Sequence, residues 1–210
     1  MVEQATSVLL DRVMMSETAF VPIGTKQDWN YENDEVLVLP YLPQSADNGL
    51  PEDFLVRLFL QTRQDGLLER TFPGFKESVN LNRFIAYLAP HTMLIGIVKA
   101  TNEVAGWSWI YDVSGPAQAR KASYGFVFFR KWWGTQEIRT LARLGLRWCF
   151  EKGELAALFG MRLLRNRLAA QFAEEMGFRL IGRVPLFFED QDAEVICLRR
   201  DEFFSTNGVT

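Results

Sequence analysis

The order of secondary-structure signals from residue 92 onward restricts the folds open to this 210-residue chain. The segments "TMLIGIVKA" and "VAGWSWIYDVSG" flank a Thr-Asn-Glu turn and predict an antiparallel hairpin, and "ASYGFVFF" predicts a third, central strand. A helix over 135–153, a strand over 155–163, a helix over 166–176 and a closing hairpin over 178–203 follow. This β-β-β-α-β-α-β-β order predicts an α/β fold, with helices flanking a central mixed β-sheet on both faces.

The N-terminal third of the chain is less regular. Clusters of Pro, Gly, Asn and Asp mark loops, and between them "VLVLPYLP" predicts a short strand. Helical patterns begin at Pro51 and again in "NLNRFIAYLAP". We expect an N-terminal extension over 1–34, a folded domain over 35–202 and a C-terminal tail over 203–210.

Composition restricts the function classes. Hydrophobic residues make up 48% of the chain and the net charge is −3, which argues against a dedicated nucleic-acid-binding protein. No apolar run is long enough to cross a membrane, and "MVEQATSVLLDRVMM" lacks the pattern of a secretory signal. We therefore expect a cytoplasmic protein in which Cys149 and Cys197 are reduced core thiols. A single histidine, His91, rules out a metal site built from several histidines, and we expect no metal.

The segment Asn166 to Phe178, "NRLAAQFAEEMGF", predicts a helix with defined ends. Asn166 is a favourable N-cap, because its side chain accepts from backbone N–H groups left free in the first turn. Gly177 supplies the left-handed residue that ends a helix, and Phe178 then folds back onto the apolar side. These local roles explain all three residues without a ligand.

The same segment resembles a strand-to-helix element of the GNAT superfamily of acyl-CoA-dependent N-acyltransferases. The matching residues are Asn166, Ala169, Phe172, Glu174, Met176, Gly177 and Phe178. The resemblance covers residues 92–202 and implies acetyl-CoA or another acyl-CoA as the cofactor. It implies an amine as the acceptor, either a small molecule or a protein N-terminus or lysine. It also implies that Asn166 contacts the pantetheine arm of CoA, and that residues 51–90 border the acceptor pocket.

The second half-site of the family lies between the third strand and the next helix, where backbone N–H groups hold the pyrophosphate. Here the segment is "FVFFRKWWGTQEIRTLARLG", similar to the "WGKG" version in GNAT enzymes that acetylate ribosomal-protein N-termini. In one alignment Gln136 and Ile138 replace the expected glycine and small residue, and in another Gly134 fills the glycine place. The cofactor-contacting residues that the resemblance implies here are Phe128, Arg130, Trp133, Gly134, Thr135 and Gln136. The ordinary alternative is that Trp132 and Trp133 pack on the core and Gly134 and Thr135 begin a helix.

Catalytic groups are harder to identify. Many GNAT enzymes carry a tyrosine on the Asn-containing helix, and Ala173 stands at that position. The third strand has no carboxylate that could deprotonate an amine. Tyr124 and Asp112 remain as weak catalytic candidates, with Glu69 and His91 behind them.

Two function classes follow. The first is a GNAT-like acyl-CoA-dependent N-acyltransferase that transfers an acetyl or acyl group to a primary amine. The second is a catalytically silent GNAT-fold structural or interaction protein, for example in a viral particle or another assembly, with protein partners in place of substrates. The replacements at Gln136 and Ala173 favour the second class. The row of Arg139, Arg143 and Arg147 is either a surface for an acidic partner or the solvated side of a helix.

Overall fold

The computed structural model describes residues 30–41, 53–72, 80–188 and 191–206. Its strands form one eight-stranded sheet in the order β1-β2-β3-β4-β5-β6-β8-β7. Every neighbouring pair is antiparallel except β5 and β6, which are parallel, so the expected mixed sheet is confirmed. The strands are β1 (Tyr31–Glu32), β2 (Val36–Tyr41), β3 (Thr92–Val98), β4 (Glu103–Ser114), β5 (Lys121–Phe128), β6 (Ala157–Leu163), β7 (Arg179–Phe188) and β8 (Gln191–Arg199).

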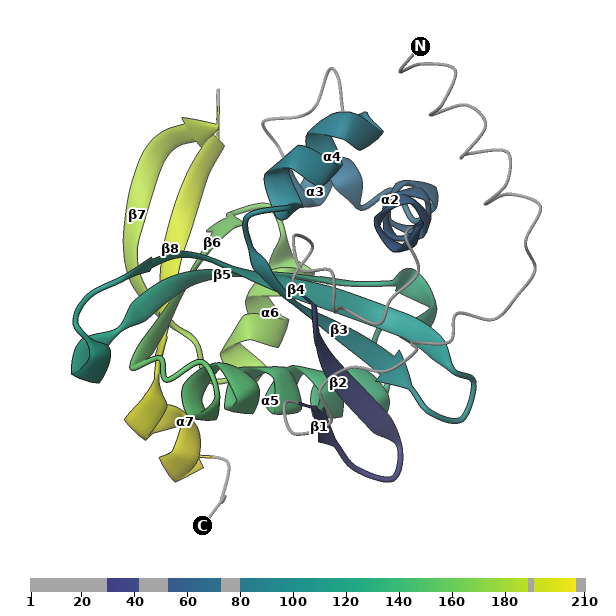
Figure 1. Ribbon diagram of the computed structural model, residues 1–210. Coiled ribbons are helices and arrows are strands. Elements are labelled where there is room, and N and C mark those ends of the chain that lie inside the picture. The colour runs from purple at the N-terminus through teal and green to yellow at the C-terminus, as the bar shows by residue number, and fades with distance from the viewer. Residues whose placement is uncertain (1–29, 42–52, 73–79, 189–190, 207–210) are drawn as a thin grey trace.

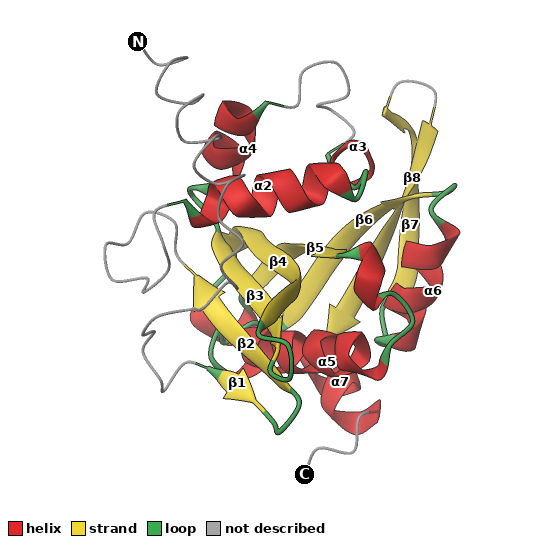
Figure 2. Ribbon diagram, turned by 90° about the vertical axis from the view of Figure 1, so that its right-hand side faces the viewer, coloured by secondary structure: helices red, strands yellow, loops and turns green. Residues whose placement is uncertain are grey.

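Helices cover both faces of this sheet, as the sequence predicts. Figures 1 and 2 show α2 (Phe54–Gln64), α3 (Leu68–Thr71) and α4 (Leu81–Leu88) on one side and α5 (Gln136–Glu151) on the other. The apolar side of α5 is buried because residues at helical spacing face the sheet: Ile138, Leu141, Ala142, Gly145, Leu146, Trp148, Cys149 and Phe150. The helix α6 (Arg167–Glu175) connects β6 to β7, and α7 (Arg200–Thr206) follows β8.

The predicted ends of α6 are confirmed. The side-chain oxygen of Asn166 accepts from the backbone N–H of Ala169 at 3.3 Å. At the other end Gly177 has a φ of 95°, a conformation that glycine adopts without strain. Phe178 is buried and its ring stacks on Tyr124, with centroids 6.5 Å apart.

Several elements differ from the prediction. The last strand ends at Arg199 instead of continuing to residue 203, and α7 follows it. The reason is tertiary, because Phe203 is buried against Phe150, with ring centroids 5.3 Å apart. The strand β1 lies in a segment expected to be irregular, and the four-residue helix α3 lies between the two helices expected from Pro51 onward. The expected extension over 1–34 lies outside the described residues except for 30–34, and the expected tail is described only as far as residue 206.

The parallel pair β5 and β6 is joined for a short length only. Lys121, Ala122 and Ser123 pair with Ala157, Leu158 and Phe159, and the two strands then diverge. β6 continues to pair with β8 as far as Leu163, so its direction is set from that side. From Tyr124 to Phe128 the edge of β5 that faces β6 is therefore open, and the candidate site lies at this opening.

Two further findings concern the described residues. Both cysteines are free thiols, Cys149 buried and Cys197 partly buried. No helix in the described part of the chain has the length and apolar character needed to span a membrane.

Candidate functional site

A cavity of about 660 Å³ occupies the opening between β5 and β6. Residues from both faces of the sheet line it. Trp109 pairs with Gly125 and Tyr111 with Ser123, and side chains at these positions face α3 and α4. Phe126 and Phe128 point to the opposite face, toward α6. The cavity therefore connects the two faces of the sheet.

The wall on the α6 side is apolar and narrow. The ring of Phe172 lies 5.7 Å from that of Phe126 and 5.3 Å from that of Phe128. Asn166 at the start of α6 lines the cavity, and Ala173 lines it one turn beyond Ala169. Ala173 stands at the helix position where the resemblance places a tyrosine, and it is buried. Because alanine has no hydroxyl, this position offers none to the cavity.

The N-terminus of α5 forms one end of the cavity. Gly134 has a φ of 78°, and a Cβ at this residue would meet nothing within 4 Å. Thr135 is the N-cap, but its side chain caps no backbone N–H, and its buried hydroxyl has no partner among the described residues. The first-turn N–H groups of a helix have no intrahelical partners, so this terminus favours an anion. Gln136 is exposed and absent from the cavity lining, so its side chain does not crowd this approach.

The loop between β5 and α5 directs its two basic side chains away from the cavity. The guanidinium of Arg130 donates to the backbone carbonyl of Asp65 at 2.6 Å, and its backbone N–H donates to the Asp65 carboxylate. Lys131 pairs with Glu103 at 2.5 Å. Neither residue lines the cavity. Trp133 does line it, and its indole N–H donates to the carbonyl of Phe128 at 2.6 Å.

Arg139 supplies a cation to the cavity, although its row was predicted to be either a surface for an acidic partner or the solvated side of a helix. Its side chain lines the cavity and donates to the carbonyls of Gly134 at 2.9 Å and Thr135 at 3.2 Å. It also pairs with Glu175 on α6 at 2.6 Å. The sequence could have indicated this role, because Arg139 lies one turn into the helix and a side chain there can reach back to the N-terminus. Arg147 pairs with Glu151, and all three arginines of the row are half-buried.

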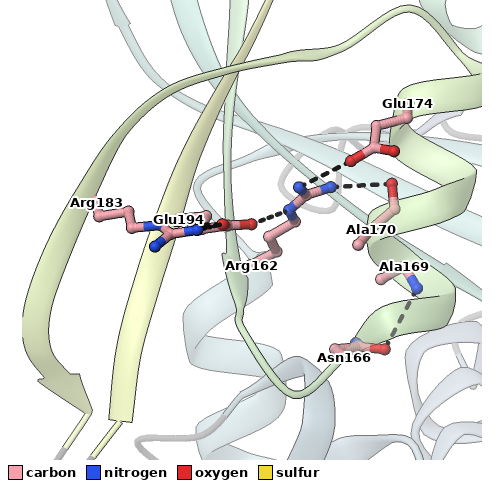
Figure 3. Close-up of polar contacts among 7 residues, drawn as sticks. All are labelled: Arg162, Asn166, Ala169, Ala170, Glu174, Arg183 and Glu194. Atoms are coloured by element: carbon pink, nitrogen blue, oxygen red, sulfur yellow. Dashed lines mark hydrogen bonds and ion pairs between the residues drawn. The ribbon is translucent and has the colours of Figure 1, made fainter.

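Arg162 fixes α6 against the sheet (Figure 3). It lies on β6 and donates to the carbonyl of Ala170 at 2.9 Å and to the carboxylate of Glu174 at 3.1 Å. On its other side it pairs with Glu194 of β8 at 2.8 Å, and Arg183 pairs with the same carboxylate at 3.0 Å. Burial raises the pKa of Glu194, but hydrogen bonds from both arginines outweigh it and leave the pKa below its usual value.

Four rings form the end of the cavity nearest α3 and α4, and we call them the aromatic wall: Phe72, Tyr87, Trp109 and Tyr111. Phe72 lies 5.2 Å from Tyr87 and 5.5 Å from Trp109, between ring centroids. Trp109 and Tyr111 are stacked at 6.3 Å. Burial raises the pKa of both tyrosines, so they stay protonated at neutral pH.

The predicted catalytic candidates occupy different environments. Tyr124 lines the cavity, but its pKa is raised strongly by burial and its hydroxyl bonds Ser108 inside the core. His91 lies behind the aromatic wall, its ring 5.3 Å from Tyr87 and 5.6 Å from Tyr111. Burial lowers the pKa of His91, and Asp112 opposes this shift. Asp112 is exposed and outside the cavity lining, and the side chain of Glu69 lies outside the described residues.

Comparison with known proteins identifies the fold. No family model and no curated protein matches this chain. Among solved structures, a GNAT-family acetyltransferase from Bacillus anthracis has a TM-score of 0.61 at 16% identity, covering 82% of this chain and 99% of that one. Ribosomal-protein-S5-alanine acetyltransferase from Vibrio fischeri has a TM-score of 0.59 at 12% identity, with coverages of 83% and 98%. Spermidine N-acetyltransferase from Vibrio cholerae, in complex with CoA and spermine, has a TM-score of 0.60 at 15% identity, with coverages of 82% and 99%. The chain therefore has the GNAT fold.

Proposed function

We propose that the protein is an acyl-CoA-dependent N-acyltransferase that transfers an acetyl or related acyl group to a primary amine. The observation that carries the proposal is the cavity between β5 and β6, which joins an uncapped helix N-terminus on one face to the aromatic wall on the other. A donor and an acceptor entering from opposite faces would meet where the strands diverge. Bringing two reactants together in this way supplies much of the rate of such a reaction.

The residues on the α5 and α6 side suit a CoA molecule. The N-terminus of α5, with Gly134 leaving open space beside it and Arg139 lining the cavity, would hold the pyrophosphate. The open edge of β5 over 124–128 offers backbone groups to the amides of the pantetheine arm. Asn166 stands at the start of α6 on the same side, where its amide would contact that arm. Bound acyl-CoA would supply the activated acyl group as a thioester.

The aromatic wall would bind the acceptor and favour its reactive form. An apolar surface disfavours the charged form of an amine, so an amine bound there loses its proton more readily than in water. Its nitrogen would then attack the thioester carbonyl carbon, the carbon–sulfur bond would break, and the proton lost by the nitrogen would balance the one that the departing thiolate takes up. We assign no protein side chain as the general base. Neither Asp112 nor His91 lines the cavity, and burial raises the pKa of Tyr124, whose hydroxyl bonds Ser108 in the core.

The test compares two helix caps of the same kind. Asn166 caps α6 beside the cavity, and Asn80 caps α4 by accepting from the N–H of Arg83 at 2.9 Å. Replacing either with alanine should cost about 1 kcal/mol of stability. Calorimetric titration with acetyl-CoA and CoA should give micromolar binding to the unmodified protein, weakened about tenfold by Asn166→Ala and unchanged by Asn80→Ala. No heat at millimolar CoA would refute the proposal.

Specific observations also favour the silent alternative. Arg130 and Lys131 are committed to Asp65 and Glu103, and the indole of Trp133 occupies the carbonyl of Phe128. A protein that no longer binds CoA would retain these contacts as stabilising interactions. In that case no acyl-CoA would shift the thermal unfolding midpoint, and the protein would act through partners in an assembly.

A further inference from the structure

We infer that the acceptor end of the cavity binds an apolar amine with one charged nitrogen, such as an arylalkylamine, and discriminates against linear polyamines. This inference rests on the acyl transfer proposed above. It follows from the kind of surface that the acceptor would meet and from the charges around it.

The aromatic wall is a continuous surface of rings held in place by the sheet, and its polar atoms are the hydroxyls of Tyr87 and Tyr111 and the indole N–H of Trp109. Trp109 and Tyr111 project from the same face of β4, and Phe72 and Tyr87 close over them from the ends of α3 and α4. A Cβ on Gly125 would overlap the indole of Trp109, so the glycine lets this ring lie flat across β5. The rings therefore extend to the point where β5 and β6 diverge, and an acceptor there would contact them along its length.

The β6 and β7 side of the cavity adds further apolar surface. Met161 and Phe187 both line the cavity, and they remain 45% and 37% exposed. Exposed apolar side chains at the border of a cavity favour the binding of an apolar ligand, because the ligand removes their apolar area from water. The acceptor body is therefore apolar on the sides that meet the aromatic wall and these two residues.

The charges lining the cavity disfavour a polycation. Among the described residues that line it, the charged ones are Arg70, Arg139, Arg162 and Glu175. Glu175 is neutralised by Arg139, and Arg162 is held by Glu174 and Glu194. Arg70 is exposed, makes no ion pair with any described residue and adjoins Thr71 and Phe72 of the acceptor end. The charge of the Asp112 carboxylate reaches Tyr87 and Tyr111 from outside the cavity lining. Among the lining residues that are described, a second or third ammonium group would therefore meet the unpaired Arg70 and no unpaired carboxylate, which is a basis for discrimination.

The test uses the full chain with acetyl-CoA and two amine probes, 2-phenylethylamine and spermidine. Thiol release should give a kcat/KM for 2-phenylethylamine at least about tenfold above that for spermidine. Calorimetry with each amine, in the presence and absence of CoA, should show the same order of affinity. The binding measurement decides the inference even if no transfer occurs, so its failure is distinct from failure of the proposed activity.

A pair of charge reversals tests the role of Arg70. Arg70→Glu should raise the affinity for spermidine about fivefold, because it places a carboxylate beside the acceptor end. Arg63→Glu makes the same change at an exposed residue of α2 that does not line the cavity, and should leave that affinity unchanged. Spermidine binding as tight as that of 2-phenylethylamine would overturn the inference. So would no binding of 2-phenylethylamine with or without CoA.

Discussion

The indole N–H of Trp133 donates to the backbone carbonyl of Phe128 at 2.6 Å, so a side chain from the following loop occupies the last carbonyl of β5. Trp133 is 39% exposed and its ring also lies 5.3 Å from the guanidinium of Arg130. The contact stands at the open edge of β5, where a ligand amide would otherwise pair with the strand. Trp133 therefore lines the cavity and also competes with a ligand for the backbone carbonyl of Phe128.

Removing only the donor of Trp133 separates these two roles. Trp133→Phe keeps a ring in place but frees the Phe128 carbonyl, and we expect CoA to bind about threefold more tightly while the protein loses about 1 kcal/mol of stability. Calorimetric titration and urea unfolding would measure the two effects. Trp133→Ala removes the ring as well and should bind CoA more weakly than Trp133→Phe does. Weaker binding by Trp133→Phe than by the unmodified protein would contradict this account.

Arg162 should be a large contributor to stability for a charged residue. The side chains of Arg162 and Glu194 are each only 9% exposed, so Arg162→Met leaves a buried carboxylate with one remaining partner, Arg183. We expect a loss of about 3 kcal/mol in the free energy of unfolding, measured by urea denaturation. Arg199→Met removes the exposed ion pair with Asp201 and should cost no more than about 0.5 kcal/mol. Equal losses in the two variants would show that the buried network is not stabilising.

The same network predicts a specific response to acid. The folded-state pKa of Glu194 lies below its ordinary value of 4.5, so its stabilising contribution is complete above about pH 5 and is lost as the pH falls through the folded pKa. Stability should therefore fall more steeply below pH 5 in the unmodified protein than in Glu194→Gln. Because Glu103 and Glu151 also have lowered pKa values, the difference between the two curves is the informative quantity. Parallel urea midpoints from pH 7 to pH 3 would contradict the prediction.

Gly125 should tolerate no side chain. An added methyl group would overlap the indole of Trp109, so Gly125→Ala should cost about 2 kcal/mol and reduce amine binding by displacing that ring. Gly182 is the matched control on β7, because a Cβ there would meet nothing within 4 Å. Gly182→Ala should change the free energy of unfolding by less than about 0.5 kcal/mol. Thermal and urea unfolding of both variants would check the difference, and similar effects would contradict the packing argument.

Local sequence patterns predicted the order of the strands and helices and the two ends of α6. Alternation and helical spacing predicted the order of strands and helices from residue 92, since these periods report which face of an element is buried. Asn166 and Gly177 marked the ends of α6 because capping and positive φ depend on neighbouring residues alone. The resemblance implied that Asn166 contacts the pantetheine arm of CoA; this stays a prediction, and in the structure the residue lines the cavity.

The tertiary structure decided where charges and rings meet. The resemblance implied that Arg130 contacts the cofactor, whereas in the structure its side chain donates to the carbonyl of Asp65 at the end of α2. Lys131 of the same loop pairs with Glu103 of β4. The aromatic wall joins rings from α3, α4 and β4, and α7 exists because Phe203 is buried against Phe150. Partners of this kind lie far apart in the chain, and sheet register sets their contacts. Periodicity shows which face of a strand is buried but not which residues of two strands lie opposite each other. The acceptor half of the cavity therefore emerged only from the folded chain.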